Sequence, residues 1–420
     1  MDQFVIEGGP FKVSGEYVVS GSKNACLPIL ASSLLFDKPI EIKNLANVKD
    51  VDTMLTLLQS LGKKIVLFKN KKSVKIYNTK INKAFASYSI VKTMRAGILV
   101  LAPLLVKHKK CITSSPGGCL IGARPINYHL KALKTMGMKF NIKKGYIYAT
   151  AKNGLKGTNV KFPKISVGAT EQLLLASVLA TGRTILKNCA IEPEILDLIN
   201  FLNTASAQIK FIGKRTIQID GVKSLKSISY SVMGDRIEFG SIAVLAALAQ
   251  GNLKIKGFNP KLIETELSLL KKTGCKIKIF NGGINIKGVK KIRNINLITG
   301  EYPKFATDLQ NIFMVLLCKA NGRSTITERI YENRFIVIGE LRRLGANIAI
   351  KGNKAIVEGN TNFQGAEIMA SDLRGAVALI LAGIAASGTT VISRVYHGLR
   401  GWENPIMKLR KIGVRIKKIS

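Results

Sequence analysis

Six small-residue marks recur at a nearly constant interval along the 420-residue chain, and they constrain the fold more than any other feature. Each mark follows an amphipathic segment and precedes a strand of alternating polarity, and successive marks lie 68 to 75 residues apart. The marks are Leu61-Gly62, Met136-Gly137, Ala205-Ser206, Thr273-Gly274, Leu344-Gly345 and Ile412-Gly413. One such interval arises easily by chance, but five consecutive ones of similar length indicate a structural unit of about seventy residues that is repeated six times.

The fourth unit shows the expected order of elements most clearly. Its hydrophobic pattern predicts an apolar helix over residues 237–249, a strand over 253–256, an amphipathic helix over 262–270 and a strand over 276–280. With the strand that opens it, each unit reads strand, apolar helix, strand, amphipathic helix, strand. This alternation predicts an α/β fold.

Polar residues occupy the same place in every unit, at the start of the apolar helix. They are Lys23-Asn24, Met94-Arg95, Ser166-Val167-Gly168, Asp235-Arg236, Thr307-Asp308 and Asp372-Leu373-Arg374. Helix capping accounts for the Ser, Thr, Asn and Asp residues. It does not account for the cations, because a positive charge at a helix N-terminus opposes the helix dipole unless an anion lies between them. We therefore expect the helix starts to converge on an anionic ligand.

The chain carries a formal net charge of +40, from 65 basic and 25 acidic side chains. Nucleic acid is the obvious partner to consider for such a charge. The lysines are spread along the whole chain, however, without interleaved aromatic residues or a nucleic-acid-binding motif. We therefore favour a diffuse basic surface that attracts anionic substrates, and a nucleic-acid-binding protein stays as an alternative.

The cysteines and the apolar runs indicate the compartment. None of the six cysteines forms a Cys-x-x-Cys pair, and the three histidines leave few candidates for a zinc site. This usage favours a reduced cytoplasm, with buried thiols and at most one reactive one. The N-terminus lacks the features of a signal peptide, and the longest apolar runs are about half the ~20 residues that a membrane span needs, so we expect no membrane span.

The most informative short segment is a glycine-rich loop over residues 116–125 that contains Cys119 five residues before Arg124. Gly117, Gly118 and Gly122 permit a close approach of the backbone to a ligand. A guanidinium stabilises a nearby thiolate and also binds phosphate or carboxylate groups. The loop therefore suggests an acid or nucleophile beside an anionic substrate, whereas the simpler alternative is a surface turn with a chance cysteine.

The chain resembles the UDP-N-acetylglucosamine 1-carboxyvinyltransferases of the enolpyruvyl transferase family, with motifs in the family's order from Phe4 to the last strand. The matching motifs are Gly21-Ser22-Lys23-Asn24-Ala25, Pro116-Gly117-Gly118-Cys119, Gly122-Ala123-Arg124-Pro125, Thr307-Asp308-Leu309-Gln310, Tyr331-Glu332-Asn333-Arg334-Phe335 and Asp372-Leu373-Arg374. The resemblance implies two inside-out α/β barrel domains of three repeats each. Residues 22–233 are expected to form the first barrel, which carries the cysteine loop, and residues 1–21 with 234–420 the second, with the active site in the cleft between them.

The resemblance also implies a reaction. The family transfers the enolpyruvyl group of phosphoenolpyruvate to the 3′-hydroxyl of UDP-N-acetylglucosamine and releases phosphate, by addition and elimination, in the first committed step of bacterial peptidoglycan synthesis. It implies Cys119 as the acid, which is also the target of fosfomycin, and Asp308 as the base. Capping of its own helix is the alternative role for Asp308. Lys23, Asn24, Arg124 and Arg400 match the ligands of phosphoenolpyruvate, although Arg400 could also be a solvated loop charge.

Further positions match the family's binding residues. Those that match the sugar-nucleotide site are Asn24, Arg95, Arg124, Pro125, Ile126, Asn127, Tyr128, Lys164, Ser166, Val167, Asp308 and Ile330. Those that match charged residues of the cleft are Asp235, Glu332, Arg334, Asp372 and Arg374, which could instead pair with one another, or in the case of Asp235 cap a helix. No metal or organic cofactor is implied. The expected partners are the two small substrates, the expected location is the bacterial cytoplasm, and a monomer is expected.

The sequence departs from the family pattern at three positions. Asn127 stands where aspartate is usual, which puts the contact with uracil in doubt. Ala306 replaces the proline before Thr307, which is expected to loosen that loop, and Ile191 stands where a basic residue is common.

Three competing functions differ in what they predict. The sister enzyme that acts on shikimate 3-phosphate shares the fold and the chemistry but lacks this cysteine loop. A nucleic-acid-binding protein would lose affinity steeply with salt and would tolerate substitution of Cys119. A decayed paralogue with a regulatory role is disfavoured by the intact set of Lys23, Cys119, Arg124, Asp308 and Arg400.

Overall fold

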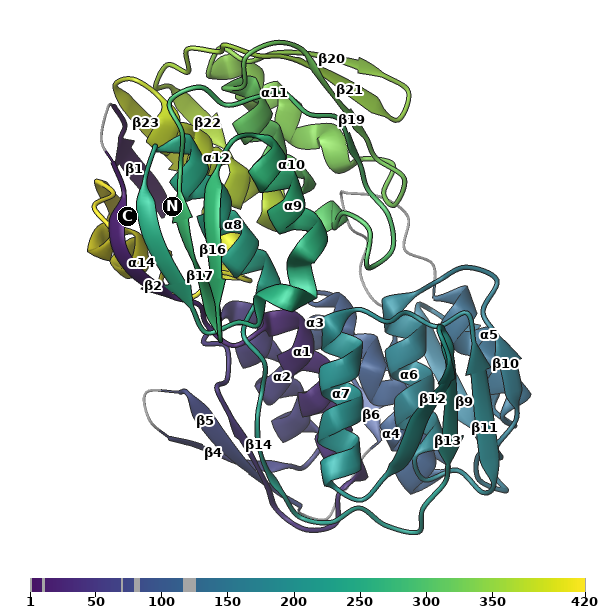
Figure 1. The fold of residues 1–420 in the computed structure, drawn as a ribbon. Coiled ribbons are helices and arrows are strands. Elements are labelled where there is room, and N and C mark those ends of the chain that lie inside the picture. Colours follow the sequence, from purple (N-terminus) through teal and green to yellow (C-terminus); the bar gives the residue numbers. More distant parts are fainter. Residues whose placement is uncertain (1, 10–11, 69–70, 79–83, 116–125, 420) are drawn as a thin grey trace. The chain divides into compact units, whose positions relative to one another are not determined.

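The computed structural model describes residues 2–9, 12–68, 71–78, 84–115 and 126–419, which fall into two compact units (Figure 1). We call the described residues between 21 and 233 the inserted unit, and the described residues of 1–20 and 234–420 the flanking unit. The cysteine loop, 116–125, lies outside the described residues.

The inserted unit contains three four-stranded sheets, with the strand orders β14-β3-β5-β4, β6-β7-β9-β8 and β10-β11-β13-β12. Its strands are β3 (Ile40–Lys43), β4 (Lys64–Phe68), β5 (Ser73–Tyr77), β6 (Phe85–Ala86), β7 (Lys110–Ser114), β8 (Lys139–Lys143), β9 (Tyr146–Thr150), β10 (Asn159–Lys161), β11 (Arg183–Lys187), β12 (Gln208–Gly213), β13 (Thr216–Asp220) and β14 (Ser229–Ser231). Its helices are α1 (Lys23–Ser32), η1 (Ser33–Leu35), α2 (Lys49–Ser60), α3 (Tyr88–Val91), η2 (Arg95–Val100), α4 (Leu101–His108), α5 (Asn127–Thr135), α6 (Val167–Ser177) and α7 (Pro193–Thr204).

The flanking unit likewise contains three four-stranded sheets, ordered β22-β23-β1-β24, β16-β17-β15-β2 and β18-β19-β21-β20. Its strands are β1 (Gln3–Glu7), β2 (Ser14–Val18), β15 (Asn252–Lys256), β16 (Lys276–Phe280), β17 (Gly283–Lys287), β18 (Leu297–Ile298), β19 (Ser324–Thr327), β20 (Asn347–Lys351), β21 (Lys354–Glu358), β22 (Glu367–Met369), β23 (Thr389–Ser393) and β24 (Ile416–Ile419). Its helices are α8 (Arg236–Leu248), η3 (Pro260–Ile263), α9 (Glu264–Lys272), α10 (Thr307–Cys318), η4 (Arg334–Val337), α11 (Ile338–Arg343), α12 (Leu373–Ala385), α13 (Tyr396–Leu399) and α14 (Pro405–Lys411).

Each repeat contains one strand more than the sequence pattern predicts. In the third repeat, β10 pairs in parallel with β11, and β12 and β13 form an antiparallel hairpin whose second strand returns to the centre of the sheet beside β11. The fourth repeat has the predicted elements at α8, β15, α9 and β16, followed by the additional strand β17. The strand predicted over 276–280 matches β16, whereas its hairpin partner β17 was not predicted.

In both units, some sheets contain strands that lie far apart in the sequence. β14, the last strand of the inserted unit, pairs in parallel with β3, so that Tyr230 lies opposite Ile42. In the flanking unit, β1 lies between β23 and β24, and β2 pairs with β15. The N-terminal strands therefore take part in the same sheets as residues more than 230 positions later.

The apolar helices of each unit pack against one another on the inner side of the sheets (Figure 1). Every residue of α8 is buried, as are nearly all residues of α10 and α12. A helix that is apolar on all sides requires burial on all sides, so the helices form the interior and the sheets lie outside them. None of the helices in the described part of the chain has the length and hydropathy needed to cross a membrane.

The six small-residue marks have a common backbone conformation. Gly62, Gly137, Gly274, Gly345 and Gly413 have φ between 95° and 108°, and Ser206 has φ 71°. Each lies just after an amphipathic helix, where a left-handed residue lets the chain reverse into the following strand. The repeat period visible in the sequence therefore records six helix ends.

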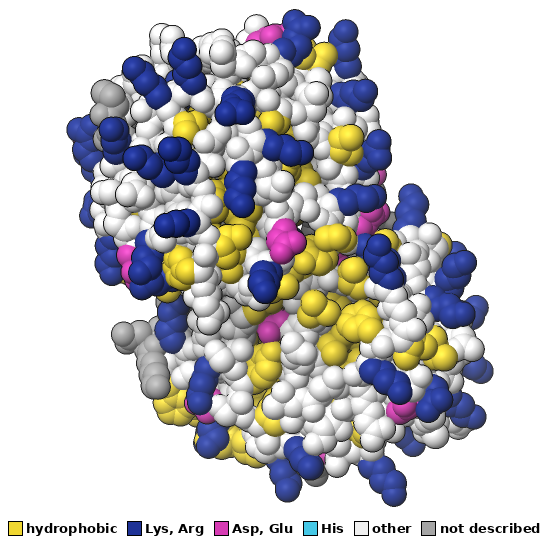
Figure 2. All heavy atoms as spheres, viewed as in Figure 1, with side chains coloured by type: hydrophobic (Ala, Val, Ile, Leu, Met, Phe, Trp, Pro, Cys, Tyr) yellow, Lys and Arg dark blue, Asp and Glu magenta, His cyan; other side chains and the backbone are white. Residues whose placement is uncertain are grey.

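The basic surface is diffuse on the face shown in Figure 2, where Lys and Arg side chains are scattered over both units. Five of the six cysteines lie among the described residues, and all five are buried, which confirms that part of the sequence prediction.

Candidate active site

Asp308 lies in the first turn of α10 between two arginines of the same unit. Its Oδ1 accepts a bond of 2.5 Å from Arg334 Nη2, and its Oδ2 accepts one of 2.8 Å from Arg374 Nη2. The aspartate side chain is 26% exposed, whereas both arginine side chains are almost fully buried. Two buried cations therefore fix the Asp308 carboxylate, while part of its side chain stays accessible to solvent.

Arg334 is fixed by more than its ion pair. Its Nε and Nη2 also donate to the carbonyl of Thr307, at 3.2 and 3.0 Å, and its guanidinium lies over the ring of Tyr331. Ala306, before the start of α10, offers no capping side chain, and the Arg334 guanidinium bonds instead to a carbonyl of the first turn.

Glu328, which follows β19, connects the start of α10 to the next loop. Its Oε2 accepts a bond from Thr307 Oγ1, and its Oε1 accepts bonds from Thr299 Oγ1 and from the backbone N–H groups of Ile330 and Tyr331. Glu328 is buried, so these four donors compensate the cost of removing a carboxylate from water. They also hold the Ile330 segment beside Asp308.

The other two apolar helices of the flanking unit begin with capping aspartates. Asp235 Oδ1 accepts from the N–H groups of Ile237 and Glu238, and Asp372 Oδ1 accepts from those of Arg374 and Gly375. Burial disfavours a charged Arg374, but the charges of Asp308 and Asp235 outweigh this and raise the pKa of Arg374. The three helix starts therefore lie close enough to interact electrostatically.

Arg400 follows α13 in a segment that packs on the first turn of α12. A Cβ added at Gly401 would stand 2.7 Å from Leu373 Cδ1, so a larger residue there would require the Leu373 side chain to shift. Burial together with the charge of Arg400 lowers the pKa of His397, whereas Asp372 opposes the shift. Arg400 thus lies near the start of α12, in the same unit as Asp308.

In the inserted unit, Lys23 is the first residue of α1 and pairs with Asp50, in the first turn of α2, at 3.3 Å. Both side chains are largely buried. Asp50 thus offsets the unfavourable position of a lysine at a helix N-terminus. Asn24 is the second residue of the same helix.

The starts of η2, α5 and α6 meet around His129. Burial first, and then the charge of Arg95 at the start of η2, lowers the pKa of His129 to about 4. The ring also lies against Gly168, where a Cβ would stand 3.1 Å from His129 Cε1. Ser166 caps α6 by accepting from Ala169 N at 3.3 Å, and Val167 next to it is exposed. The structure therefore brings Arg95 near Ser166 and Val167.

The remaining predicted residues have varied positions. Ile126, Asn127 and Tyr128 form the start of α5, where Asn127 is exposed. Lys164 is exposed before α6, and Glu332 is exposed in the turn before Arg334. Cys119, Arg124 and Pro125 lie outside the described residues.

The structure shows the surroundings of Ala306 and Ile191, two of the positions at which the sequence differs from the family pattern. The backbone N–H of Ala306 donates to Glu266 Oε1 at 3.0 Å, a bond that a proline cannot form, so the loop before Thr307 is anchored rather than loosened. Ile191 is half-buried before Glu192.

Asp50, His129 and Glu328 are site neighbours that the sequence reasoning missed. A possible signal for Asp50 was that it is an acidic residue at the start of the helix that follows the one beginning with Lys23. No local pattern marks Glu328, because its donors come from three separate segments.

This arrangement can now be compared with known proteins. Residues 8–409 match the EPSP synthase (3-phosphoshikimate 1-carboxyvinyltransferase) family. The chain is 56% identical over 412 residues to a UDP-N-acetylglucosamine 1-carboxyvinyltransferase of Pelagibacter ubique, covering 98% of each chain, and 46% identical over 422 residues to one of Rickettsia bellii, covering 100% of each.

Solved structures agree on the fold. The enolpyruvyl transferase NikO from Streptomyces tendae matches with a TM-score of 0.90 at 22% identity, covering 100% of this chain and 99% of that one. EPSP synthase from Acinetobacter baumannii matches with a TM-score of 0.77 at 19% identity, covering 100% of each chain. The predicted fold class and the predicted resemblance are confirmed, and the chain belongs to the EPSP synthase family of enolpyruvyl transferases, in the group of the UDP-N-acetylglucosamine 1-carboxyvinyltransferases.

Proposed function

We propose that this chain transfers the enolpyruvyl group of phosphoenolpyruvate to the 3′-hydroxyl of UDP-N-acetylglucosamine and releases phosphate. The observation that carries the choice of acceptor is the 56% identity over nearly the full length with an enzyme named for that reaction. The solved structure of EPSP synthase is only 19% identical to this chain, so it supports the fold and not the choice of acceptor.

Asp308 is the proposed base for the sugar hydroxyl. Arg334 and Arg374 favour its ionised form and fix its orientation, while its exposed side can accept a hydrogen bond from a hydroxyl group. The arginines make the carboxylate a weak base. We therefore propose that the proton leaves the hydroxyl as the new C–O bond forms rather than before. Cys119 is the proposed acid that protonates the methylene carbon of phosphoenolpyruvate, which generates the electrophilic carbon.

Lys23, Asn24, Arg124 and Arg400 are the proposed ligands for the phosphate and carboxylate of phosphoenolpyruvate. Bidentate guanidinium groups suit both anions. The positions of Lys23 at the start of α1 and of Arg400 beside the start of α12 support this assignment, because helix N-termini add their own attraction for an anion. We propose that residues of both units serve this one reaction.

The proposed sugar-nucleotide ligands in the inserted unit are Arg95, Ser166 and Val167, whose clustering around His129 supports the assignment. Ile330 and Asp308 are the proposed contacts from the flanking unit. The other proposed sugar-nucleotide positions are Asn24, Arg124, Pro125, Ile126, Asn127, Tyr128 and Lys164.

We further propose that residues 22–233 and residues 1–21 with 234–420 act as two domains, and that the protein is a monomer of the bacterial cytoplasm with small-molecule partners. The scattered lysines in Figure 2 favour small anionic substrates over nucleic acid.

The test is phosphate release by the purified protein, with each substrate omitted in turn and shikimate 3-phosphate offered as the alternative acceptor. Release should require phosphoenolpyruvate and UDP-N-acetylglucosamine together, and Asp308→Ala should abolish it. Release with shikimate 3-phosphate alone would assign the chain to the sister activity instead.

A further inference from the structure

A buried hydrogen-bonded network contacts the segment 399–408, which includes Arg400 and is called the Arg400 segment below. None of the steps proposed for the reaction uses this network. Its centre is Glu238, in the first turn of α8. Glu238 Oε1 accepts from Tyr17 Oη at 2.7 Å and from Lys408 Nζ at 2.6 Å, and Oε2 accepts from Ser20 N at 3.0 Å. Only 4% of the Glu238 side chain and 15% of the Lys408 side chain are exposed.

The network holds the chain that follows Arg400 at two points, Trp402 and Lys408. Trp402, two residues after Arg400, is buried and donates from Nε1 to Tyr17 Oη at 3.1 Å. Lys408, in α14, also donates to Ser20 Oγ, so the helix that follows the segment is tied to the same centre. Burial and the charge of Glu238 raise the pKa of Tyr17, which keeps its hydroxyl protonated and able to donate to the carboxylate.

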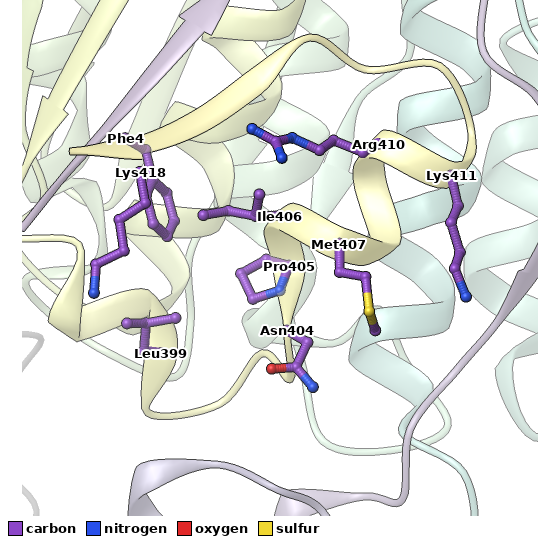
Figure 3. A pocket seen from close by; sticks show the side chains of 9 residues that line it. All are labelled: Phe4, Leu399, Asn404, Pro405, Ile406, Met407, Arg410, Lys411 and Lys418. Carbon is purple, nitrogen blue, oxygen red and sulfur yellow. The ribbon is translucent and has the colours of Figure 1, made fainter.

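A groove of about 660 Å³ borders this segment. Nine residues line it, among them Leu399, Pro405 and Met407, and Figure 3 shows their side chains. Close to Arg400, the chain is held by the packing of Gly401 against Leu373 and by the bonds of Trp402 and Lys408.

We propose that Tyr17, Glu238 and Lys408 are positioning residues that hold Arg400 in the orientation that binds the anionic groups of phosphoenolpyruvate. This inference rests on the proposed role of Arg400. A buried ion pair contributes less to stability than to geometry, since its desolvation offsets much of its attraction. A guanidinium binds a carboxylate or phosphate bidentately only in one orientation, so its affinity for the anion increases when the backbone that carries it is held in place.

The chain offers a spectroscopic probe and a matched control. Trp402 is the only tryptophan, so intrinsic tryptophan fluorescence reports on the Arg400 segment alone. Lys418 pairs with Asp2 at 2.6 Å in the same unit, the same distance as Lys408 with Glu238, but both partners are 43% exposed. Lys418→Met therefore controls for removing a lysine and its ion pair without touching the network.

The experiment measures the KM of each substrate, and the quenching of Trp402 by phosphoenolpyruvate, in Tyr17→Phe, Lys408→Met, Lys418→Met and Arg400→Ala. We expect Arg400→Ala and Lys408→Met to raise the KM for phosphoenolpyruvate about 10-fold or more, and Tyr17→Phe about 3-fold, as expected for losing bonds to charged or buried groups. The KM for UDP-N-acetylglucosamine should change less than twofold, and Lys418→Met should behave as the wild type. Because the network acts through Arg400, Lys408→Met should add little in the Arg400→Ala background.

Three outcomes would overturn the proposal. One is an unchanged affinity for phosphoenolpyruvate in Tyr17→Phe and Lys408→Met while Arg400→Ala loses it. Another is a parallel loss of affinity for both substrates, which would indicate a general structural role. If Arg400→Ala itself binds phosphoenolpyruvate normally, the proposed role of Arg400 fails, and the positioning proposal fails with it.

Discussion

Replacing Asp308 by asparagine separates the structural from the chemical role of this residue. The wild-type carboxylate accepts one bond from each of two buried guanidinium groups. An asparagine keeps the shape and one acceptor oxygen, but its amide NH₂ faces the other guanidinium, donor against donor. The substitution thus leaves two buried positive charges with a much weaker partner.

The magnitude follows from burial. Removing one partner of a fully buried ion pair costs about 3–5 kcal/mol, and the 26% exposure of the Asp308 side chain places this case at the lower end, at about 3 kcal/mol. For a domain of about 200 residues, 1 kcal/mol corresponds to a change of about 2–4 °C in melting temperature. We therefore expect the midpoint to fall by about 6–12 °C.

The assay is calorimetric melting of Asp308→Asn and of the double variant Asp308→Asn/Arg374→Met, together with phosphate release at 20 °C. The double variant should recover part of the loss because one stranded charge is gone. Activity should fall at least about 100-fold in both, the usual contribution of a general base. Asp220→Asn is the control, since Arg183, its partner at 2.6 Å, is 61% exposed and water can solvate the charge that the substitution leaves, so the midpoint should hardly move. A midpoint for Asp308→Asn equal to that of the wild type would refute the electrostatic argument, and full activity at 20 °C would remove Asp308 as the base.

Three further predictions concern other parts of the chain. Ser206→Gly should stabilise the protein by about 0.5–1 kcal/mol, because a serine with φ 71° stands where the other five helix ends have glycine, whereas Gly274→Ala should destabilise it by about 1–2 kcal/mol. Urea unfolding measures both changes, and a change of the same sign in the two variants would contradict the reasoning. The pKa of His129 is lowered to about 4, so the unfolded chain takes up this proton before the folded one as the pH falls. The free energy of unfolding should therefore decline between pH 6.5 and 4 by up to about 3 kcal/mol. Melting curves of His129→Gln should show a shallower decline, and an identical decline would exclude this histidine as the cause. Cys119→Asp should retain some phosphate release, because a carboxylic acid also donates a proton, yet resist fosfomycin, and an inhibition curve that matches the wild type would exclude Cys119 as the reactive thiol.

The elements that the sequence predicted well are those with a local cause. The apolar helices begin where the polar residues Lys23, Arg95, Ser166, Asp235, Thr307 and Asp372 indicate, because a helix start is determined by capping and by the onset of an apolar run. The resemblance to the family was equally readable, since it rests on short motifs in a fixed order.

Other features depended on contacts that no local pattern encodes. Hairpin strands such as β17 were not predicted, and the position of β1 between β23 and β24 joins residues 382 to 416 positions apart. Asp50 was missed as the partner of Lys23, and Glu328 as the link between Thr307 and Ile330, because their partners come from separate segments.

The sequence by itself determined the repeat, the helix starts and ends, and the residue types available for the chemistry, because turns, caps and apolar periodicity act over a few residues. Only the tertiary structure decided that Asp308 lies between Arg334 and Arg374, and that Glu238 joins Tyr17, Ser20 and Lys408 behind Arg400. A buried charge is stable only where distant parts of the chain supply its partners, and that choice is made by packing rather than by sequence neighbours.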